Sequence, residues 1–146
     1  MSDFIIYTDG GSRGNPGPAA IGFVIQDSAG RTLKEHGEAI GETTNNVAEY
    51  KALVAALKKL KALIGSTKAE AMTIEVRADS ELLMKQLKGE YKIKEETLIP
   101  LFIEIWNVKQ DFKNINFVHI PREKNKMADH MVNVALDGEE SQGKFF

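Results

Sequence analysis

The sequence of 146 residues contains no cysteine and no long apolar run. Disulfide bonds and thiolate metal ligands are therefore excluded, and a reducing compartment suits the chain. The first residues, MSDFIIYTDGG, lack the basic start and the apolar stretch of a secretory signal. No apolar run approaches the ~18–20 residues that cross a bilayer. We therefore expect a cytoplasmic protein that does not bind membranes.

The chain also lacks an excess of positive charge, because 19 Lys and Arg stand against 21 Asp and Glu. This balance argues against a protein that holds nucleic acid through general phosphate attraction alone. It does not exclude an enzyme whose metal ions neutralise an acidic centre. With 42% hydrophobic residues, the chain fits one domain, which would bury roughly 70% of its unfolded surface. We expect this domain over residues 1–136, followed by a polar, mobile tail over 137–146.

Hydrophobic periodicity predicts three strands at the start of the chain, followed by helices interspersed with two further strands. Three strands separated by turn residues are typical of an antiparallel meander, and apolar residues at i+3/i+4 spacing predict the helices. A later strand–helix–strand unit should be parallel and right-handed. The pattern therefore predicts an α/β fold with a mixed sheet. The expected elements are strands at 4–8, 20–26, 32–40, 72–78 and 115–120, helices at 46–64, 80–88, 98–112 and 126–136, and a turn at 9–18.

Four acidic residues stand at predicted strand ends or helix starts. They are Asp9 in IYTDGGSRGNPG, Glu49 in TTNNVAEYKAL, Asp79 in VRADSELLMKQLKGEYK and Asp129 in HIPREKNKMADHMV. Ligands of open α/β sheets bind at the carboxyl ends of the strands. Carboxylate oxygens are the ligands that hard divalent cations prefer. The pattern predicts one shared cation site.

Each of these segments also has a purely structural explanation. GGSRGNPG is compatible with a plain turn, and it matches neither a dinucleotide fingerprint nor a P-loop. Glu49 follows Asn46 by three residues, as in a capping box. Asp79 with Ser80 is a typical helix N-cap, and the helix dipole alone favours Asp129 in a first turn.

Taken in order, the four acidic segments resemble those of the type 1 ribonuclease H family, from about Ile5 to Val134. The resemblance implies the ribonuclease H-like fold, a five-stranded sheet in the order 3-2-1-4-5 with strand 2 antiparallel and helices on its flanks. It implies an endonuclease that hydrolyses the RNA strand of RNA–DNA hybrids and leaves 5′-phosphate and 3′-hydroxyl ends. The hybrid is then the partner, and a monomer is expected.

The resemblance also assigns roles to residues. Asp9 matches a ligand that bridges two Mg²⁺ ions, with Glu49 and Asp79 on one ion and Asp129 on the other; Mn²⁺ is an alternative. Asn45 and Asn46 match residues that recognise the hybrid partly through ribose 2′-hydroxyls, which distinguish RNA from DNA. The complete set of implied substrate-binding residues is Gly10, Gly11, Ser12, Asn15, Asn45, Asn46, Gln86, Lys92 and Arg122.

Two features depart from many members of that family. The loop before Asp129 lacks their histidine, and Arg122 is the residue nearest to its place, while His119 is expected to be structural. The stretch Gly89–Thr97 is too short for a basic protrusion, so the chain resembles the compact subgroup. The alternatives are a DNA-cutting resolvase, a nuclease that also cuts double-stranded RNA, and a catalytically silent hybrid-binding module. The four acids and the Asn45-Asn46 pair favour a nuclease that acts on hybrids.

Overall fold

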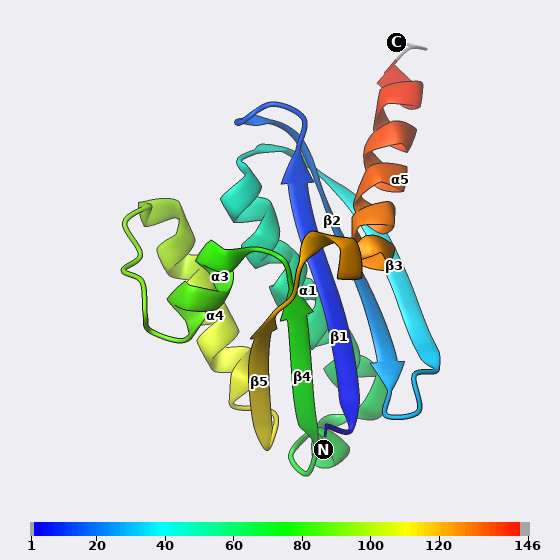
Figure 1. The fold of residues 1–146 in the computed structure, drawn as a ribbon, viewed down its shortest axis with the longest axis vertical. Helices are drawn as coiled ribbons and strands as arrows, with labels where there is room; N and C mark the ends of the chain where they lie inside the picture. Colours follow the sequence, from blue (N-terminus) through cyan, green and yellow to red (C-terminus); the bar gives the residue numbers. More distant parts are fainter. Residues whose placement is uncertain (1, 144–146) are drawn as a thin grey trace.

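The computed structural model describes residues 2–143 and contains a five-stranded sheet in the order β3-β2-β1-β4-β5 (Figure 1). Strand β2 runs antiparallel to β1 and β3, while β1, β4 and β5 are parallel. The predicted strand order and the mixed sheet are therefore confirmed. The strands are β1 (Phe4–Ser12), β2 (Gly17–Asp27), β3 (Thr32–Thr43), β4 (Thr73–Ala78) and β5 (Asn114–His119).

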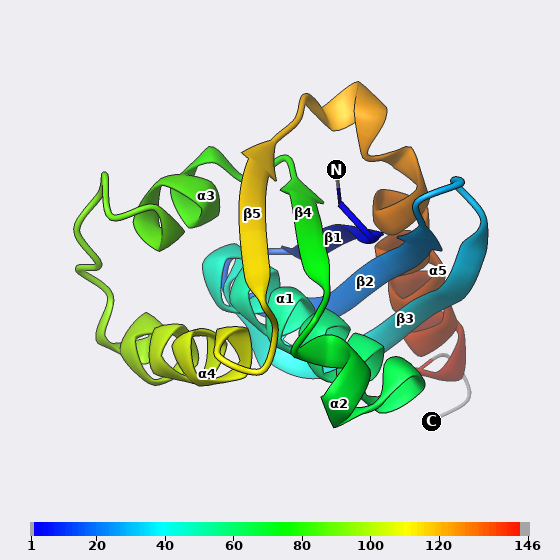
Figure 2. The same ribbon diagram turned by 90° about the horizontal axis from the view of Figure 1, so that it is seen from below.

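Helices cover the two faces of the sheet unequally (Figures 1 and 2). Helices α1, α3 and α4 share the main apolar core with one face, and α5 packs on the other face against β2 and β3. None of the helices within residues 2–143 is long and apolar enough to cross a membrane. The helices are α1 (Asn45–Ile64), α2 (Ser66–Ala69), α3 (Glu81–Leu87), α4 (Ile99–Lys109) and α5 (Lys126–Gly143), with 3₁₀ turns η1 (Glu96–Leu98) and η2 (Arg122–Lys124).

Period-two alternation places the core on the α1 face. Phe4 and Ile6 of β1 and Ile74 and Val76 of β4 are buried there, since alternate residues of a strand point to the same face. The intervening residues face α5 or solvent. Asp9 belongs to this second set, so its side chain lies on the α5 face of the sheet.

Paired glycines allow α5 to cross the sheet in close contact. Gly22 pairs with Gly37 on β3 and with Asp9 on β1. A Cβ atom at Gly22 would lie 2.5 Å from the carbonyl oxygen of Ala128, and one at Gly37 would collide with the carbonyl of Met131. Only glycine fits at such an approach. Because Gly22 is in register with Asp9, the crossing brings the first turn of α5 to Asp9.

Several elements differ from the sequence prediction. Strand β1 continues through Gly10 and Gly11 to Ser12, which pairs with Ala19, so the predicted turn at 9–18 is wrong and only residues 13–16 form the bend. The short helix α2 was not predicted. Helix α5 continues past Leu136 to Gly143, so residues 137–143 are helical; residues 144–146 of the predicted tail lie outside the described residues.

Candidate active site

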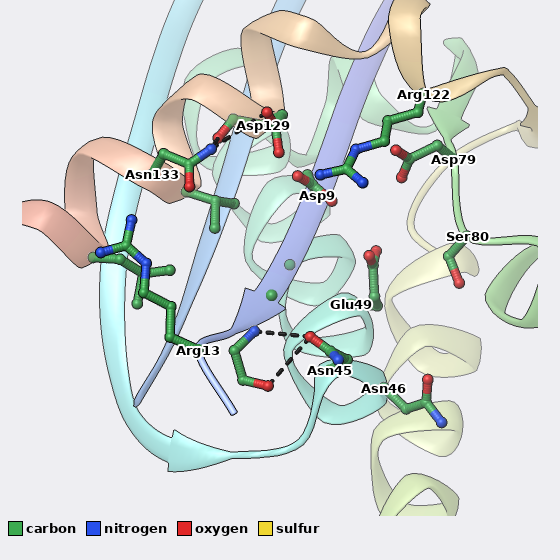
Figure 3. A pocket seen from close by; sticks show the side chains of 15 residues that line it. Asp9, Arg13, Asn45, Asn46, Glu49, Asp79, Ser80, Arg122, Asp129 and Asn133 are labelled. Atoms are coloured by element: carbon green, nitrogen blue, oxygen red, sulfur yellow. Dashed lines mark hydrogen bonds between the residues drawn. The ribbon is translucent and has the colours of Figure 1, made fainter. Parts of the chain in front are cut away.

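Three of the four predicted acids meet at one edge of the sheet. One carboxylate oxygen from each of Asp9, Glu49 and Asp79 lies within 4.8 Å of the other two. Tyr7 pairs with Arg77 on the adjacent parallel strand, so Asp9 and Asp79 lie at equivalent positions two residues further along. All four acids line a cleft of about 500 Å³ (Figure 3). The full lining is Asp9, Gly10, Gly11, Ser12, Arg13, Asn45, Asn46, Glu49, Asp79, Ser80, Arg122, Asp129, Val132, Asn133 and Leu136.

Asp9 occupies the centre of this group. It is buried, with 8% of its surface exposed. Burial, followed by the negative charges of Asp79 and Asp129, raises the pKa of Asp9 from 3.8 to about 7. Its carboxyl also interacts with the side chains of Glu49 and Asp129. Asp9 therefore contacts acids on both sides of the cleft.

Glu49 does not serve as a helix cap. The N-cap of α1 is Thr44, whose hydroxyl accepts a hydrogen bond from the Val47 N–H at 3.3 Å, so the structure rules out the alternative in which Asn46 and Glu49 form a capping box. The close approach of α1 to Gly10 carries Glu49 into the cleft, since a Cβ at Gly10 would lie 2.5 Å from the Glu49 nitrogen. Burial, followed by the charges of Asp9 and Asp79, raises the pKa of Glu49 well above its usual range.

Asp79 is not the N-cap of the helix that follows it, α3. Ser80 is the N-cap of α3, and its hydroxyl accepts a hydrogen bond from the Leu83 N–H at 3.2 Å. The carboxylate of Asp79 is therefore available to the cleft. His119 ends β5, and its Nε2 lies 3.3 Å from the carbonyl oxygen of Asp79. His119 is not among the residues that line the cleft, which agrees with a structural role.

Asp129 lies in the first turn of α5, as predicted. The Nδ2 of Asn133 donates to the backbone oxygen of Asp129 at 3.1 Å and to its Oδ2 at 3.3 Å. Sequence reasoning missed Asn133, although its i+4 spacing from Asp129 places both on one helix face. Asn133 therefore restrains the acid that comes from the far side of the cleft.

The four acids fit a divalent cation. Their oxygens are hard donors, and Asp9 and Glu49 resist ionisation in each other's presence without a counter-charge. The buried Oε2 of Glu49 has no hydrogen-bond partner among residues 2–143. A buried acceptor without a partner is costly. A cation between these carboxylates would remove both costs.

Arg122 places a positive charge at the same cleft. It begins the 3₁₀ turn η2, and its guanidinium points toward Asp9 and Asp79 in Figure 3. The adjacent Asn125 is 1% exposed and fixes this segment to β1, because its Nδ2 donates to the Thr8 carbonyl oxygen at 2.8 Å. The structure thus brings Arg122 to the acids, as the sequence predicted for the loop.

The tip of the β1–β2 hairpin is tied to the start of α1. The backbone N–H and the hydroxyl of Ser12 donate to the Oδ1 of Asn45 at 2.8 and 3.2 Å, and the Asn45 N–H donates to the Oδ1 of Asn15 at 3.1 Å. Arg13 forms an ion pair with Asp137 at 2.8 Å, which attaches the tip to α5 as well. Of the predicted substrate residues in this region, Gly10, Gly11, Ser12, Asn45 and Asn46 line the cleft.

Gln86 and Lys92 lie away from the acids. Gln86 is buried, accepts a hydrogen bond from the Tyr50 hydroxyl at 2.6 Å and donates to the Lys92 carbonyl oxygen at 3.3 Å. Both residues line a second cavity, of about 420 Å³, together with Lys94 and Glu95. Gln86 therefore braces the segment before α4, and its predicted contact with substrate stays a prediction.

Comparison with known proteins gives one family match and several close relatives. Residues 7–135 match the family described as "Reverse transcriptase-like". The chain is 40% identical over 134 residues to a bifunctional protein of Mycobacterium tuberculosis, covering 91% of this chain and 35% of that protein. The chain thus spans about a third of the length of this curated relative.

Two solved structures resemble more than nine-tenths of this chain. A ribonuclease H1 named LC11, solved in complex with an RNA/DNA hybrid, is 54% identical with a TM-score of 0.87, covering 93% of this chain and 98% of that one. Ribonuclease H1 of the halophilic archaeon Halobacterium salinarum is 38% identical with a TM-score of 0.85, covering 92% and 98%.

Proposed function

Because this chain belongs to the type 1 ribonuclease H family, we propose that it is an endonuclease that hydrolyses the RNA strand of RNA–DNA hybrids. One observation carries the proposal: four carboxylates from β1, α1, the end of β4 and α5 line a single cleft. The hybrid bound to the similar ribonuclease H1 supports the substrate class. A binding module without activity would not need this repulsive arrangement of acids.

We propose that these acids hold Mg²⁺, with Mn²⁺ as an alternative. Asp9 interacts with Glu49 on one side and Asp129 on the other, which suits a ligand shared by two ions. Glu49 and Asp79 would complete one ion site and Asp129 the other. When bound, the ions would supply an activated water and stabilise the attacking and leaving oxygens of the displacement.

Three residues of the cleft besides the acids, Arg122, Asn45 and Asn46, bind and orient the hybrid. Arg122 offers a guanidinium to a phosphate beside the acids, which suits bidentate recognition of phosphate oxygens. Asn45 and Asn46 supply polar contacts at the other end of the cleft. Replacing both with alanine should weaken hybrid cleavage, since each hydrogen bond is worth roughly 0.5–1.5 kcal/mol. The products should carry 5′-phosphate and 3′-hydroxyl ends.

A substrate panel tests the proposal. Labelled RNA–DNA hybrid, RNA duplex and DNA duplex are incubated with the protein, with Mg²⁺ and with EDTA. Only the RNA strand of the hybrid should be cut, and only with Mg²⁺. Glu70→Gln, which changes an exposed acid outside the cleft, should cleave like the parent. Binding without cleavage would indicate a silent module, while equal cutting of RNA duplex or DNA would refute the hybrid specificity.

A further inference from the structure

Two adjacent side-chain amides at the start of α1 are held in defined and opposite orientations. Asn45 and Asn46 both line the cleft beside Glu49. An amide can usually turn over and exchange its donor and acceptor, so its orientation must come from its partners. Here both partners have fixed hydrogen-bonding character.

Asn45 is oriented through its oxygen. Its Oδ1 accepts from the backbone N–H of Ser12, a group that can only donate. The amide of Asn45 therefore directs its Nδ2 donors away from Ser12 (Figure 3).

Asn46 is oriented through its nitrogen. Its Nδ2 donates to the Oε1 of Glu95 at 2.6 Å, and an ionised carboxylate can only accept. The Oδ1 of Asn46 must then face away from Glu95. In Figure 3 this oxygen points to the side of the cleft where Glu49 lies, while the nitrogen points away from it.

Glu95 is itself held in place by the segment between α3 and α4. Its backbone oxygen accepts from the Leu98 N–H at 3.0 Å, at the start of η1. Gln86 fixes the same segment three residues earlier by donating to the Lys92 carbonyl oxygen, and Tyr50 of α1 in turn donates to Gln86. These contacts join the backbone of the segment to α1, so the exposed Glu95 side chain starts from a fixed position beside Asn46.

We propose that Glu95 is a specificity-determining positioning residue, which presents the Asn46 oxygen to the hybrid as an acceptor for a ribose 2′-hydroxyl. The inference rests on the proposed function of the cleft. A 2′-hydroxyl can donate to this oxygen, and a deoxyribose cannot. If the amide were turned over, its NH₂ could donate to the 2′-oxygen but could no longer accept from the hydroxyl, so the requirement for a donating 2′ group would be lost.

A scan of modified substrates with Glu95 variants tests this inference. Hybrids carry one 2′-deoxy or one 2′-fluoro nucleotide at each position of the RNA strand in turn, and both modifications remove the donor. With the parent protein, both should lower kcat/KM at the same ribose by roughly three- to tenfold, the worth of one hydrogen bond. Asn46→Ala should abolish the sensitivity at that ribose alone.

The variants separate amide orientation from charge. Glu95→Lys places a donor against Asn46 and should turn its amide over, so that a 2′-fluoro group, which keeps a weak acceptor, is tolerated at that ribose. Glu95→Gln keeps an oxygen acceptor and should retain the parent's sensitivity at that ribose. Glu96→Lys makes the same charge change at the next, exposed residue and should keep the parent's profile. Glu95→Ala, which removes the acceptor without adding a charge, should reduce the sensitivity even if the lysine variant fails to fold.

Several results would overturn the inference. A Glu95→Lys profile equal to that of Glu96→Lys would show that Glu95 does not orient Asn46. Loss of sensitivity in Glu95→Gln as large as in Glu95→Lys would assign the effect to charge. A parent protein that cuts no hybrid would refute the proposed function itself, whereas a parent that cuts hybrids without sensitivity at any ribose would refute this inference alone.

Discussion

Asp9→Asn separates a metal site from a purely structural acid. The pKa of Asp9 rises from 3.8 to about 7 in the folded protein because of burial and the neighbouring carboxylates. Below pH 3.8 the Asp9 carboxyl is protonated in both the folded and the unfolded state, so it does not lower the free energy of unfolding. As the pH rises from 3.8 to about 7, only the unfolded state releases the proton, so stability is lost. Above pH 7 the whole cost is present, about 4 kcal/mol from a difference of about 3 pH units.

Asparagine removes this ionisation at nearly constant shape. With EDTA at pH 7.5, the free energy of unfolding of Asp9→Asn should therefore exceed that of the parent by about 2–4 kcal/mol, the lower value allowing for imperfect hydrogen bonding of the buried amide. Near pH 3.5 the two proteins should be equally stable. Urea unfolding at the two pH values measures both differences. Glu70→Gln controls for the loss of one negative charge at an exposed position.

Metal and substrate complete the test of Asp9. Excess Mg²⁺ should stabilise the parent more than Asp9→Asn, because a ligand that binds only the folded state shifts unfolding by mass action. The variant should also lose hybrid cleavage. A variant that is destabilised, active and unchanged in its response to Mg²⁺ would refute the reasoning and leave Asp9 with a structural role.

Five further substitutions probe how the cleft is assembled. Arg122→Ala should lower kcat/KM without removing a limb of the pH–rate profile near neutral pH, whereas His119→Ala should leave turnover nearly intact; a large loss in the His119 variant would reverse the two roles. Gly37→Ala should destabilise the protein by about 1–3 kcal/mol in thermal unfolding, because the added methyl group collides with the backbone of α5; unchanged stability would show that α5 yields. Arg13→Ala and Asp137→Ala should each raise the KM for hybrid, because either change removes the ion pair that attaches the hairpin tip to α5. An unchanged KM in Asp137→Ala would show that the ion pair does not hold the tip.

Local patterns predicted a mixed sheet with acids at strand ends and helix starts, and the family resemblance implied the strand order; neither predicted the extent of every element. Gly10 and Gly11 have low strand propensity, which made the 9–18 segment look like a turn. In the structure, pairing with β2 and the close approach of α1 at Gly10 override that preference. The same contact carries Glu49 into the cleft. Glu49 is not needed as a cap, because helix α1 begins one residue earlier than its apolar pattern indicates and Thr44 is the cap.

Contacts between distant residues were beyond the reach of the sequence pattern. The α5 segment after Leu136 lacks apolar periodicity, and its ion pair joins Asp137 to Arg13 at the other end of the chain. Glu95 and Asn46 meet only because the segment before α4 folds back on α1. Their contact carries no local signal, since Glu95 alone resembles an ordinary charged surface residue.

Helix α5, which carries the fourth carboxylate, is attached to the sheet separately from the main core. The main core lies on the opposite face of the sheet, and α5 is held by a separate small apolar cluster of Ala20, Val132 and Leu136. A peripheral unit of this kind opens at a lower free energy than the whole domain. On heating, catalysis should therefore fade reversibly before the sheet melts. Substitutions that improve the packing of α5 on the sheet should therefore raise the temperature at which activity is lost more than substitutions in the main core.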